Sequence, residues 1–213
     1  MMPSSDELQR LADAGELIAY FGYGSLVNPA THRTPVLGYS VARLWNWQRA
    51  WVPRPQADKA LPIALLSSSP ASTGAWLDGL LVFDSAQSLA SLDAREAGYR
   101  RLSVVHDQLD SETQLPANCP VYVYEAVPHA SDATRGAILQ SYLDAVLQGY
   151  AHMHSAASVE RFIVSTLNFD TPVLRDRDAP LYPRAVSLTA REQALIDDAT
   201  AQLNFIKGDH AAG

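Results

Sequence analysis

The stretch Tyr20-Phe21-Gly22-Tyr23-Gly24-Ser25-Leu26 decides how this chain is interpreted. It follows the apolar Leu17-Ile18-Ala19 and precedes Asn28-Pro29, so the pattern predicts a strand that ends in a tight loop. Two glycines flank Tyr23, and glycines let a backbone turn sharply and expose consecutive N–H groups that can bind an anion. The structural alternative is an ordinary glycine-rich turn. Other parts of the sequence have to decide between the two.

Length and composition restrict the class of protein. The chain has 213 residues, of which 47% are hydrophobic, which is enough to bury the core of one or two domains. Its formal net charge of −7 argues against a nucleic-acid-binding surface, because no basic stripe is available to neutralise phosphates. A single cysteine excludes an internal disulfide and fits a reducing compartment. No secretory signal or membrane-spanning run is evident, so we expect a soluble, cytoplasmic protein.

The first part of the chain, residues 17–127, predicts a β-rich unit with one conspicuous helix. Several short apolar runs separated by proline, glycine and serine are typical of strands. Trp45, Trp47 and Arg49 alternate within one such run, so we expect them to share one face of a strand.

The second part, residues 128–213, has apolar residues at helical spacing. Thr189 and Glu192 form a possible capping box, and apolar residues through Ile206 continue on one face of the helix that would follow. We expect a helical extension that packs on the β-rich unit.

Glu96 is the first candidate for catalysis. It follows Leu92 by four residues and Leu89 by seven, so the three side chains share a helical face. A carboxylate at the end of an apolar face points toward the interior or a cavity rim, where desolvation raises its pKa and makes it a better proton acceptor. The structural alternative, which spacing alone favours, is a helix-end glutamate that pairs with a nearby arginine. The candidates for that pairing are Arg95, Arg100 and Arg101.

Other catalytic patterns fit less well. Val27 stands where a dinucleotide fingerprint needs its third glycine, and no Lys-Ser/Thr pair follows for a phosphate-binding loop. The Gly-x-Ser-x-Gly elbow of serine hydrolases is absent from the sequence. One cysteine and scattered histidines do not suit a metal site, so none is predicted. Cys119, next to Pro120, is expected to be a bystander and not a nucleophile.

Two motifs occur in order along residues 17–127. The first is Phe21-Gly22-Tyr23-Gly24-Ser25-Leu26, followed by Gly38-Tyr39 and an aromatic and basic stretch through Arg49. Trp76-Leu77-Asp78-Gly79-Leu80 continues the pattern, and Leu92-Asp93-x-Arg95-Glu96-x-Gly98-Tyr99-Arg100 completes it. Together they resemble the γ-glutamylcyclotransferase superfamily, and particularly its ChaC-like, glutathione-specific branch.

The resemblance implies an α+β fold, a mixed β-barrel-like sheet flanked by helices, here with a helical C-terminal extension. It also implies a cavity in which backbone N–H groups of the glycine loop hold the α-carboxylate of a γ-glutamyl group. The family's catalytic glutamate falls on Glu96, and a substrate-orienting tyrosine falls on Tyr122 or Tyr124. Our candidate substrate-binding residues are therefore Tyr23, Gly24, Ser25, Leu26 and Tyr124.

The implied activity is cyclisation of a γ-glutamyl group to 5-oxoproline, with release of the amine half. The nucleophile is the substrate's own α-amine, so no metal, cofactor or covalent enzyme intermediate is implied. Glutathione is the expected substrate, which would give Cys-Gly as the second product. The alternatives are another γ-glutamyl peptide or amine, or a non-catalytic small-molecule-binding module of the same fold. We expect neither nucleic-acid nor membrane partners, and the oligomeric state is open.

The sequence departs from the family pattern in places that leave the identity of the substrate's leaving group undecided. Val27-Asn28-Pro29 stands where the ChaC-like branch usually carries a tryptophan, and the region from residue 133 onward is larger than the minimal fold needs. Arg177 and Arg184 in that region are expected to make structural ion pairs. The alternative is that they reach the cavity and bind a second carboxylate. We expect the C-terminal helices to narrow the leaving-group side of the cavity.

Overall fold

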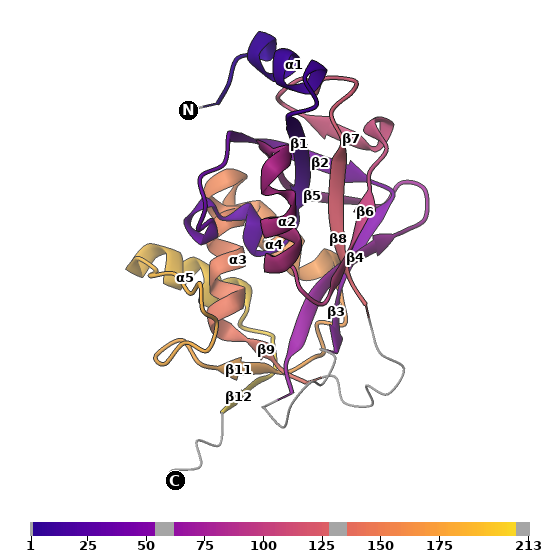
Figure 1. Ribbon diagram of the computed structural model, residues 1–213. Helices are drawn as coiled ribbons and strands as arrows, with labels where there is room; N and C mark the ends of the chain where they lie inside the picture. Colours follow the sequence, from indigo (N-terminus) through magenta and orange to yellow (C-terminus); the bar gives the residue numbers. More distant parts are fainter. Residues whose placement is uncertain (1, 54–61, 128–135, 208–213) are drawn as a thin grey trace.

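Strand β1 (Leu17–Gly22) is buried along its whole length and lies inside a six-stranded mixed sheet (Figure 1). The computed structural model describes residues 2–53, 62–127 and 136–207. In the sheet, β1 pairs antiparallel with β5 (Trp76–Ser85) and parallel with β8 (Val121–Ala126). The strand predicted before the glycine loop is therefore present and central.

The six strands follow the order β6-β8-β1-β5-β2-β7. The members not yet named are β6 (Tyr99–Ser103), β2 (Gly38–Trp45) and β7 (Leu109–Ser111). The α+β class with a mixed sheet and flanking helices is confirmed, but the barrel-like closure is wrong. Closure requires the two edge strands to pair, whereas β6 and β7 stay apart, and no sheet in the described part of the chain closes on itself.

A second sheet begins where the chain bends at Asn46. This residue has a φ of 64°, a left-handed conformation that asparagine tolerates better than most residues. Trp45 ends β2 in the first sheet, whereas Trp47 and Arg49 lie in β3 (Trp47–Pro53) of the second. The expectation that the three side chains share one face is therefore wrong for Trp45. The second sheet has the order β10-β3-β4, with β4 (Ala64–Pro70) and β10 (Thr166–Leu167) beside β3.

The first two α-helices each have one end marked by a residue that favours it. Ser4 caps α1 (Ser5–Asp13), because its hydroxyl accepts the Glu7 N–H (3.2 Å). Helix α2 (Leu89–Arg95) ends just before Gly98, which has a φ of 95°. Glu96 is the C-cap of α2, so it lies at the point where the chain leaves the helix for β6.

The C-terminal region is only partly helical. It contains α3 (Gln140–Met153), α4 (Ala156–Ser165), α5 (Ala190–Ala199), β9 (Ile138–Leu139), β11 (Val173–Arg175) and β12 (Phe205–Lys207). The capping box of Thr189 and Glu192 is confirmed, but α5 stops at Ala199 and not near Ile206. Ile206 instead lies in β12, which pairs with β11 in a third sheet of order β12-β11-β9. The unit boundary expected at residues 127–128 adjoins 128–135, which lie outside the described residues.

Helix α3 packs directly against the segment that follows the glycine loop. The Asn28 side chain donates to the Ala145 carbonyl and to the Gln148 side-chain oxygen, both at 2.9 Å. Gly149 allows this approach, because a Cβ there would come within 2.7 Å of Asn28. The C-terminal region therefore holds the loop from behind, with a polar contact buried at the interface.

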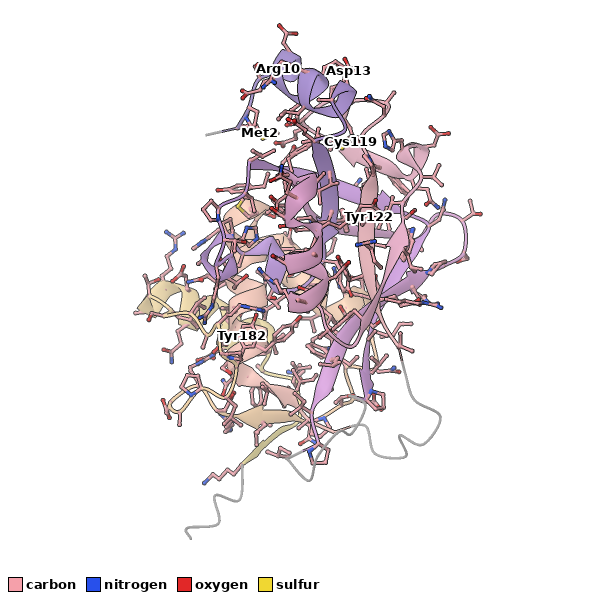
Figure 2. The ribbon with its side chains drawn as sticks, viewed as in Figure 1. Met2, Arg10, Asp13, Cys119, Tyr122 and Tyr182 are labelled. Carbon is pink, nitrogen blue, oxygen red and sulfur yellow. The ribbon has the colours of Figure 1, made fainter. Side chains whose placement is uncertain are left out.

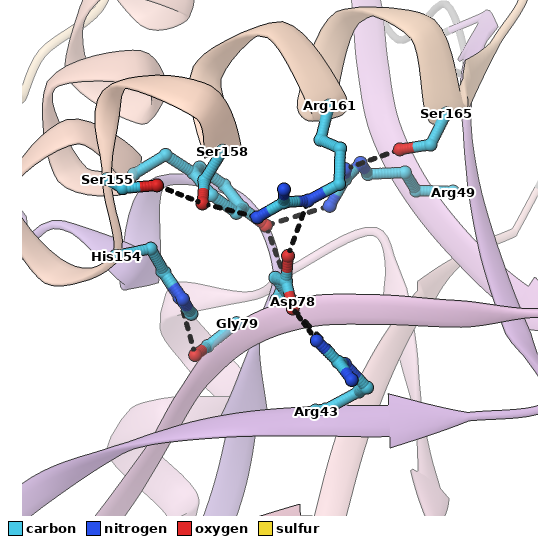
Figure 3. Close-up of polar contacts among 10 residues, drawn as sticks. Arg43, Arg49, Asp78, Gly79, His154, Ser155, Ser158, Arg161 and Ser165 are labelled. Carbon is cyan, nitrogen blue, oxygen red and sulfur yellow. Dashed lines mark hydrogen bonds and ion pairs between the residues drawn. The ribbon is translucent and has the colours of Figure 1, made fainter.

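A polar cluster around two buried residues, Asp78 and Arg49, joins α4 to both sheets (Figure 3). Asp78 on β5 pairs with Arg43 on β2 (3.3 Å) and with Arg161 on α4 (3.2 Å). Arg49 on β3 is 2% exposed and donates to hydroxyls of Tyr150, Ser165 and Thr166 at 2.7–3.0 Å. Such paired and bonded charges fix the position of a helix on a sheet, because separating them leaves polar groups unsatisfied.

Candidate active site

The glycine loop leaves β1 and forms a single 3₁₀ turn, η1 (Ser25–Val27). The Val27 N–H donates to the Gly24 carbonyl and the Asn28 N–H to the Ser25 carbonyl, both at 3.0 Å. The N–H groups of Gly24, Ser25 and Leu26 come before these bonds, at the end where a helical turn has no carbonyl partners of its own. The Tyr142 hydroxyl accepts the Ser25 N–H. Such consecutive donors can hold an anion.

Crowding explains both glycines of the loop. A Cβ on Gly22 would lie 2.6 Å from the Leu26 Cβ, and a Cβ on Gly24 would lie 2.6 Å from the Tyr142 hydroxyl oxygen. Neither glycine has a positive φ. The turn was expected to need conformational freedom, whereas the structure shows that it needs room.

Tyr23 anchors the loop to its neighbours. Its hydroxyl donates to the Tyr124 carbonyl (2.5 Å), which ties the loop to β8. Its own carbonyl accepts the Tyr150 hydroxyl (3.0 Å), which ties the loop to α3. Both sides of the loop are therefore fixed, one by the sheet and one by the C-terminal region.

Glu96 combines the two interpretations that its spacing allows. Its carboxylate pairs with the Arg95 Nε at 3.1 Å, as the structural alternative predicts. The side chain is nevertheless only 17% exposed, and burial raises its pKa above the ordinary glutamate value. The positive charges of Arg95 and Arg184 oppose that rise. A carboxylate with a raised pKa is suited to accept and return a proton.

One small cavity, of about 40 Å³, brings the predicted residues together. Its lining consists of Phe21, Gly22, Tyr23, Gly24, Ser25, Leu26, Leu66, Glu96, Tyr99, Tyr124 and Tyr142. The loop therefore faces Glu96 across a shared space. The sequence analysis assigns six candidate residues to one site, and all six line this cavity: Tyr23, Gly24, Ser25, Leu26, Glu96 and Tyr124.

Tyr124 lines the cavity and Tyr122 does not. The Tyr124 hydroxyl donates to Asp93 on α2 (2.6 Å), so it supports the helix that carries Glu96. Tyr122 instead stacks beneath the guanidinium of Arg101 at 4.8 Å. Strand alternation does not explain this difference, because residues 122 and 124 share one face of β8 and differ only in their position along it.

The fold gives this geometry a context. A solved structure described as a gamma-glutamyl cyclotransferase superposes on this chain with a TM-score of 0.53 and 15% sequence identity. The match covers 86% of this chain and 99% of that one. The chain has the γ-glutamyl cyclotransferase fold.

Two further solved structures resemble the chain at lower TM-scores. An uncharacterized protein from Homo sapiens has 16% identity, a TM-score of 0.48 and coverage of 85% of this chain and 99% of that one. A glutathione-specific γ-glutamyl cyclotransferase from yeast has 15% identity, a TM-score of 0.42 and coverage of 87% and 96%. No protein-family model and no curated sequence matches the chain. At such identities the likeness concerns the γ-glutamyl cyclotransferase fold and not the substrate.

Within this γ-glutamyl cyclotransferase fold, Tyr142 is one of the cavity residues that are not among the six candidates. Its helical spacing in α3 suggested only a core position. The ring packs edge-on against Trp51 (5.9 Å between centroids) and Tyr182 (5.0 Å), and the hydroxyl reaches the glycine loop. Burial raises the pKa of the phenol, so the hydroxyl keeps its proton and remains a donor.

The two arginines considered for a second carboxylate have different environments. Arg177 forms a bidentate pair with Asp144 (2.7 and 2.8 Å) and also contacts Asp197 (2.8 Å), so it makes the structural ion pairs expected of it. Arg184 makes none with any described residue, and its charge acts on Glu96. The structural ion pair expected of Arg184 is therefore not found among the described residues.

Cys119 is remote from the cavity. Figure 2 places it near α1, whereas Tyr182 lies beside α3. It is 2% exposed, and burial raises the pKa of its thiol to about 12, so it has no thiolate character near neutral pH. Among the residues with described positions, no group of three His, Cys, Asp or Glu side chains is arranged to hold a metal ion. No described helix combines the length and apolar character needed to cross a membrane.

Proposed function

We propose that the protein is a γ-glutamylcyclotransferase that converts a γ-glutamyl compound to 5-oxoproline and a free amine. The observation that carries this proposal is the shared cavity, in which a desolvated Glu96 faces the loop of Gly24, Ser25 and Leu26. A cavity with convergent polar groups and a carboxyl group of raised pKa is the expected form of an acid–base site.

The reaction requires one bond to form and one to break within the substrate. The loop N–H groups hold the α-carboxylate, and Glu96 takes a proton from the α-ammonium group, which leaves a free amine. The amine nitrogen then attacks the γ-carbonyl carbon and closes a five-membered lactam. As the bond to the leaving nitrogen breaks, Glu96 returns its proton to that nitrogen. The ring nitrogen gives up its second proton, and the released amine takes up a proton to become an ammonium ion. Holding both reacting groups in one molecule is worth effective molarities of about 10⁵ M or more when orientation is good.

The size of the cavity decides how much of the substrate it encloses. Pockets for drug-sized ligands usually measure roughly 300–1,000 Å³, whereas this cavity measures about 40 Å³. It can enclose part of the reacting γ-glutamyl head, and the leaving half must extend outside. The head therefore defines the reaction, and residues around the opening define the leaving group.

Glutathione is our best candidate substrate, because the motif around Glu96 resembles that of the glutathione-specific branch. The same chemistry on another γ-glutamyl peptide or amine is the first alternative. A non-catalytic binding module is the alternative from a different class. A desolvated carboxylate favours the enzyme, since burying one is costly and a binding module has little use for it.

The test is incubation with glutathione, followed by measurement of 5-oxoproline and Cys-Gly. We expect product from the wild type and a loss of about 10²-fold or more with Glu96→Gln, the scale of a lost general base. Glu160→Gln, an exposed position on α4, is the control and should retain full activity. If glutathione gives no product, a panel of γ-glutamyl amino acids and amines follows. Binding of 5-oxoproline without turnover of any panel member would identify the binding module instead.

A further inference from the structure

Arg184 lies in a tight turn that packs against a residue of the cavity wall, and its charge acts on Glu96. The Ala185 N–H donates to the Tyr182 carbonyl (3.1 Å), so Arg184 sits within a four-residue turn. The Tyr182 ring packs on Tyr142, which lines the cavity, with 5.0 Å between ring centroids. The turn is therefore attached to the wall of the proposed site.

Two further contacts hold this turn in place. The Tyr182 N–H donates to the Ser141 hydroxyl (3.2 Å) at the start of α3. The Arg33 guanidinium donates to the Pro183 carbonyl, which links the turn to the segment after the glycine loop. Arg184 is thus carried by backbone that is fixed on both sides, as a binding residue requires.

Within the part of the chain that the structure describes, no acid forms an ion pair with Arg184. Other arginines near the site have carboxylate partners within the protein, as in the Arg95–Glu96 and Arg101–Asp93 pairs. Arg184 is half-buried and forms no ion pair with any residue whose position is described. Its charge also lowers the pKa of Glu96, which makes the proposed base weaker. A half-buried cation that lowers the pKa of the base reduces its ability to accept a proton. Binding of an anionic ligand to that cation would offset the reduction.

We propose that Arg184 binds a carboxylate on the leaving half of the substrate and selects γ-glutamyl amino acids and peptides over γ-glutamyl alkylamines. This inference rests on the proposed function. The site then has two anion-binding elements, the glycine loop for the γ-glutamyl head and Arg184 for the leaving half. A guanidinium suits the second role because it offers two parallel donors to a carboxylate.

Carboxylate binding at Arg184 also couples the substrate to the base. A bound carboxylate offsets the positive charge of Arg184, which lowers the pKa of Glu96. The effect of burial is then less opposed, so the pKa of Glu96 rises further. The acid limb of kcat should therefore lie at higher pH with a substrate that carries this carboxylate. The difference should disappear when Arg184 loses its charge.

The experiment compares two substrates that differ by one group. γ-Glutamyl-alanine carries the carboxylate, and γ-glutamyl-ethylamide is the same molecule without it. For Arg184→Gln we expect kcat/KM on the pH plateau to fall about tenfold or more for the first, as the loss of a charge-assisted bond predicts. For the second we expect a change below about twofold. Arg184→Lys should retain part of the preference, and Arg191→Gln, exposed on α5, should retain all of it.

The outcomes separate this inference from the function on which it rests. Equal losses on both substrates, or no loss on either, would overturn the role of Arg184 while leaving the cyclotransferase in place. A wild type that converts neither these substrates nor the wider panel overturns the proposed function, and with it this inference. An unchanged melting temperature in Arg184→Gln excludes a general loss of folding as the cause of a selective loss.

Discussion

The Tyr142 hydroxyl lies against Gly24, so closely that a methyl group on Gly24 would come within 2.6 Å of the phenol oxygen. The two residues lie far apart in the sequence, one in the glycine loop and the other in α3. The contact shows how the C-terminal region shapes the site. It also gives Gly24 a role that conformational freedom does not explain.

Gly24→Ala should impair the site by crowding. The added Cβ would press on Tyr142, whose ring is confined by Trp51 and Tyr182, and would lie 3.3 Å from Leu66. We expect a loss of about 1–3 kcal/mol in the free energy of unfolding, as for overpacked cores. We also expect kcat/KM to fall about tenfold or more. Urea denaturation and steady-state kinetics measure the two effects.

Removing the phenol oxygen provides the control for that prediction. Because Phe lacks the atom that Gly24→Ala would meet, the double variant Gly24→Ala/Tyr142→Phe should recover part of the lost stability. A double-mutant cycle should give a favourable coupling of about 0.5 kcal/mol or more. Simple additivity of the two single variants would show that the Gly24–Tyr142 contact is not the cause.

The sequence predicted the parts of the site that lie in local motifs. Apolar periodicity and the positions of the glycines predicted the strand that ends at Gly22, the glycine loop that follows it, and the helix before Glu96. Tyr142 could not be identified this way, since its helical spacing is the same for a core residue and for a cavity wall. Its role depends on where α3 packs, and that packing depends on contacts such as Asn28 with Ala145, 117 residues apart in sequence.

Two errors have similar physical causes. The break between β2 and β3 depends on one left-handed residue, Asn46, which alternation of large side chains does not reveal. The early end of α5 reflects pairing of Ile206 with Leu174 in a parallel sheet, a tertiary contact that overrides helical spacing. In both cases the local pattern is present in the sequence, but the backbone conformation of one residue or a tertiary contact overrides it.

Arg95→Gln should move the acid limb of the pH–rate profile to higher pH. Arg95 is the largest of the charges that lower the pKa of Glu96, and burial already holds that pKa above the ordinary value. Without Arg95 the pKa rises further, so the active carboxylate is lost at higher pH as the solution is acidified. The measurement is kcat/KM against pH. Arg100→Gln, whose partner is Glu125, should leave the limb in place, and a shift to lower pH in Arg95→Gln would contradict the assignment of Glu96 as base.

Glu96→Gln should stabilise the fold at neutral pH. The pKa of Glu96 is higher in the folded state than in the unfolded chain, so the unfolded state releases its proton first as pH rises. Its contribution opposes folding above the folded-state pKa and vanishes below the unfolded-state value, about 4.3 for a free glutamate. The gain in the free energy of unfolding should therefore be present at pH 7 and disappear at low pH. Glu160→Gln, exposed on α4, should show no such pH-dependent gain.

Asp78→Ala should destabilise the fold through the cluster that joins α4 to the sheets. Its side chain is 9% exposed and pairs with Arg43 and Arg161, so its loss leaves two guanidinium groups without their acid. We expect the free energy of unfolding to fall by about 2–4 kcal/mol. This is slightly less than for breaking a fully buried ion pair, because both arginines are partly exposed. Glu125→Ala is the matched comparison, since its partner Arg100 is 62% exposed and such pairs contribute about 1 kcal/mol or less. Equal losses in the two variants, measured by urea denaturation, would show that burial of Asp78 does not strengthen its contribution.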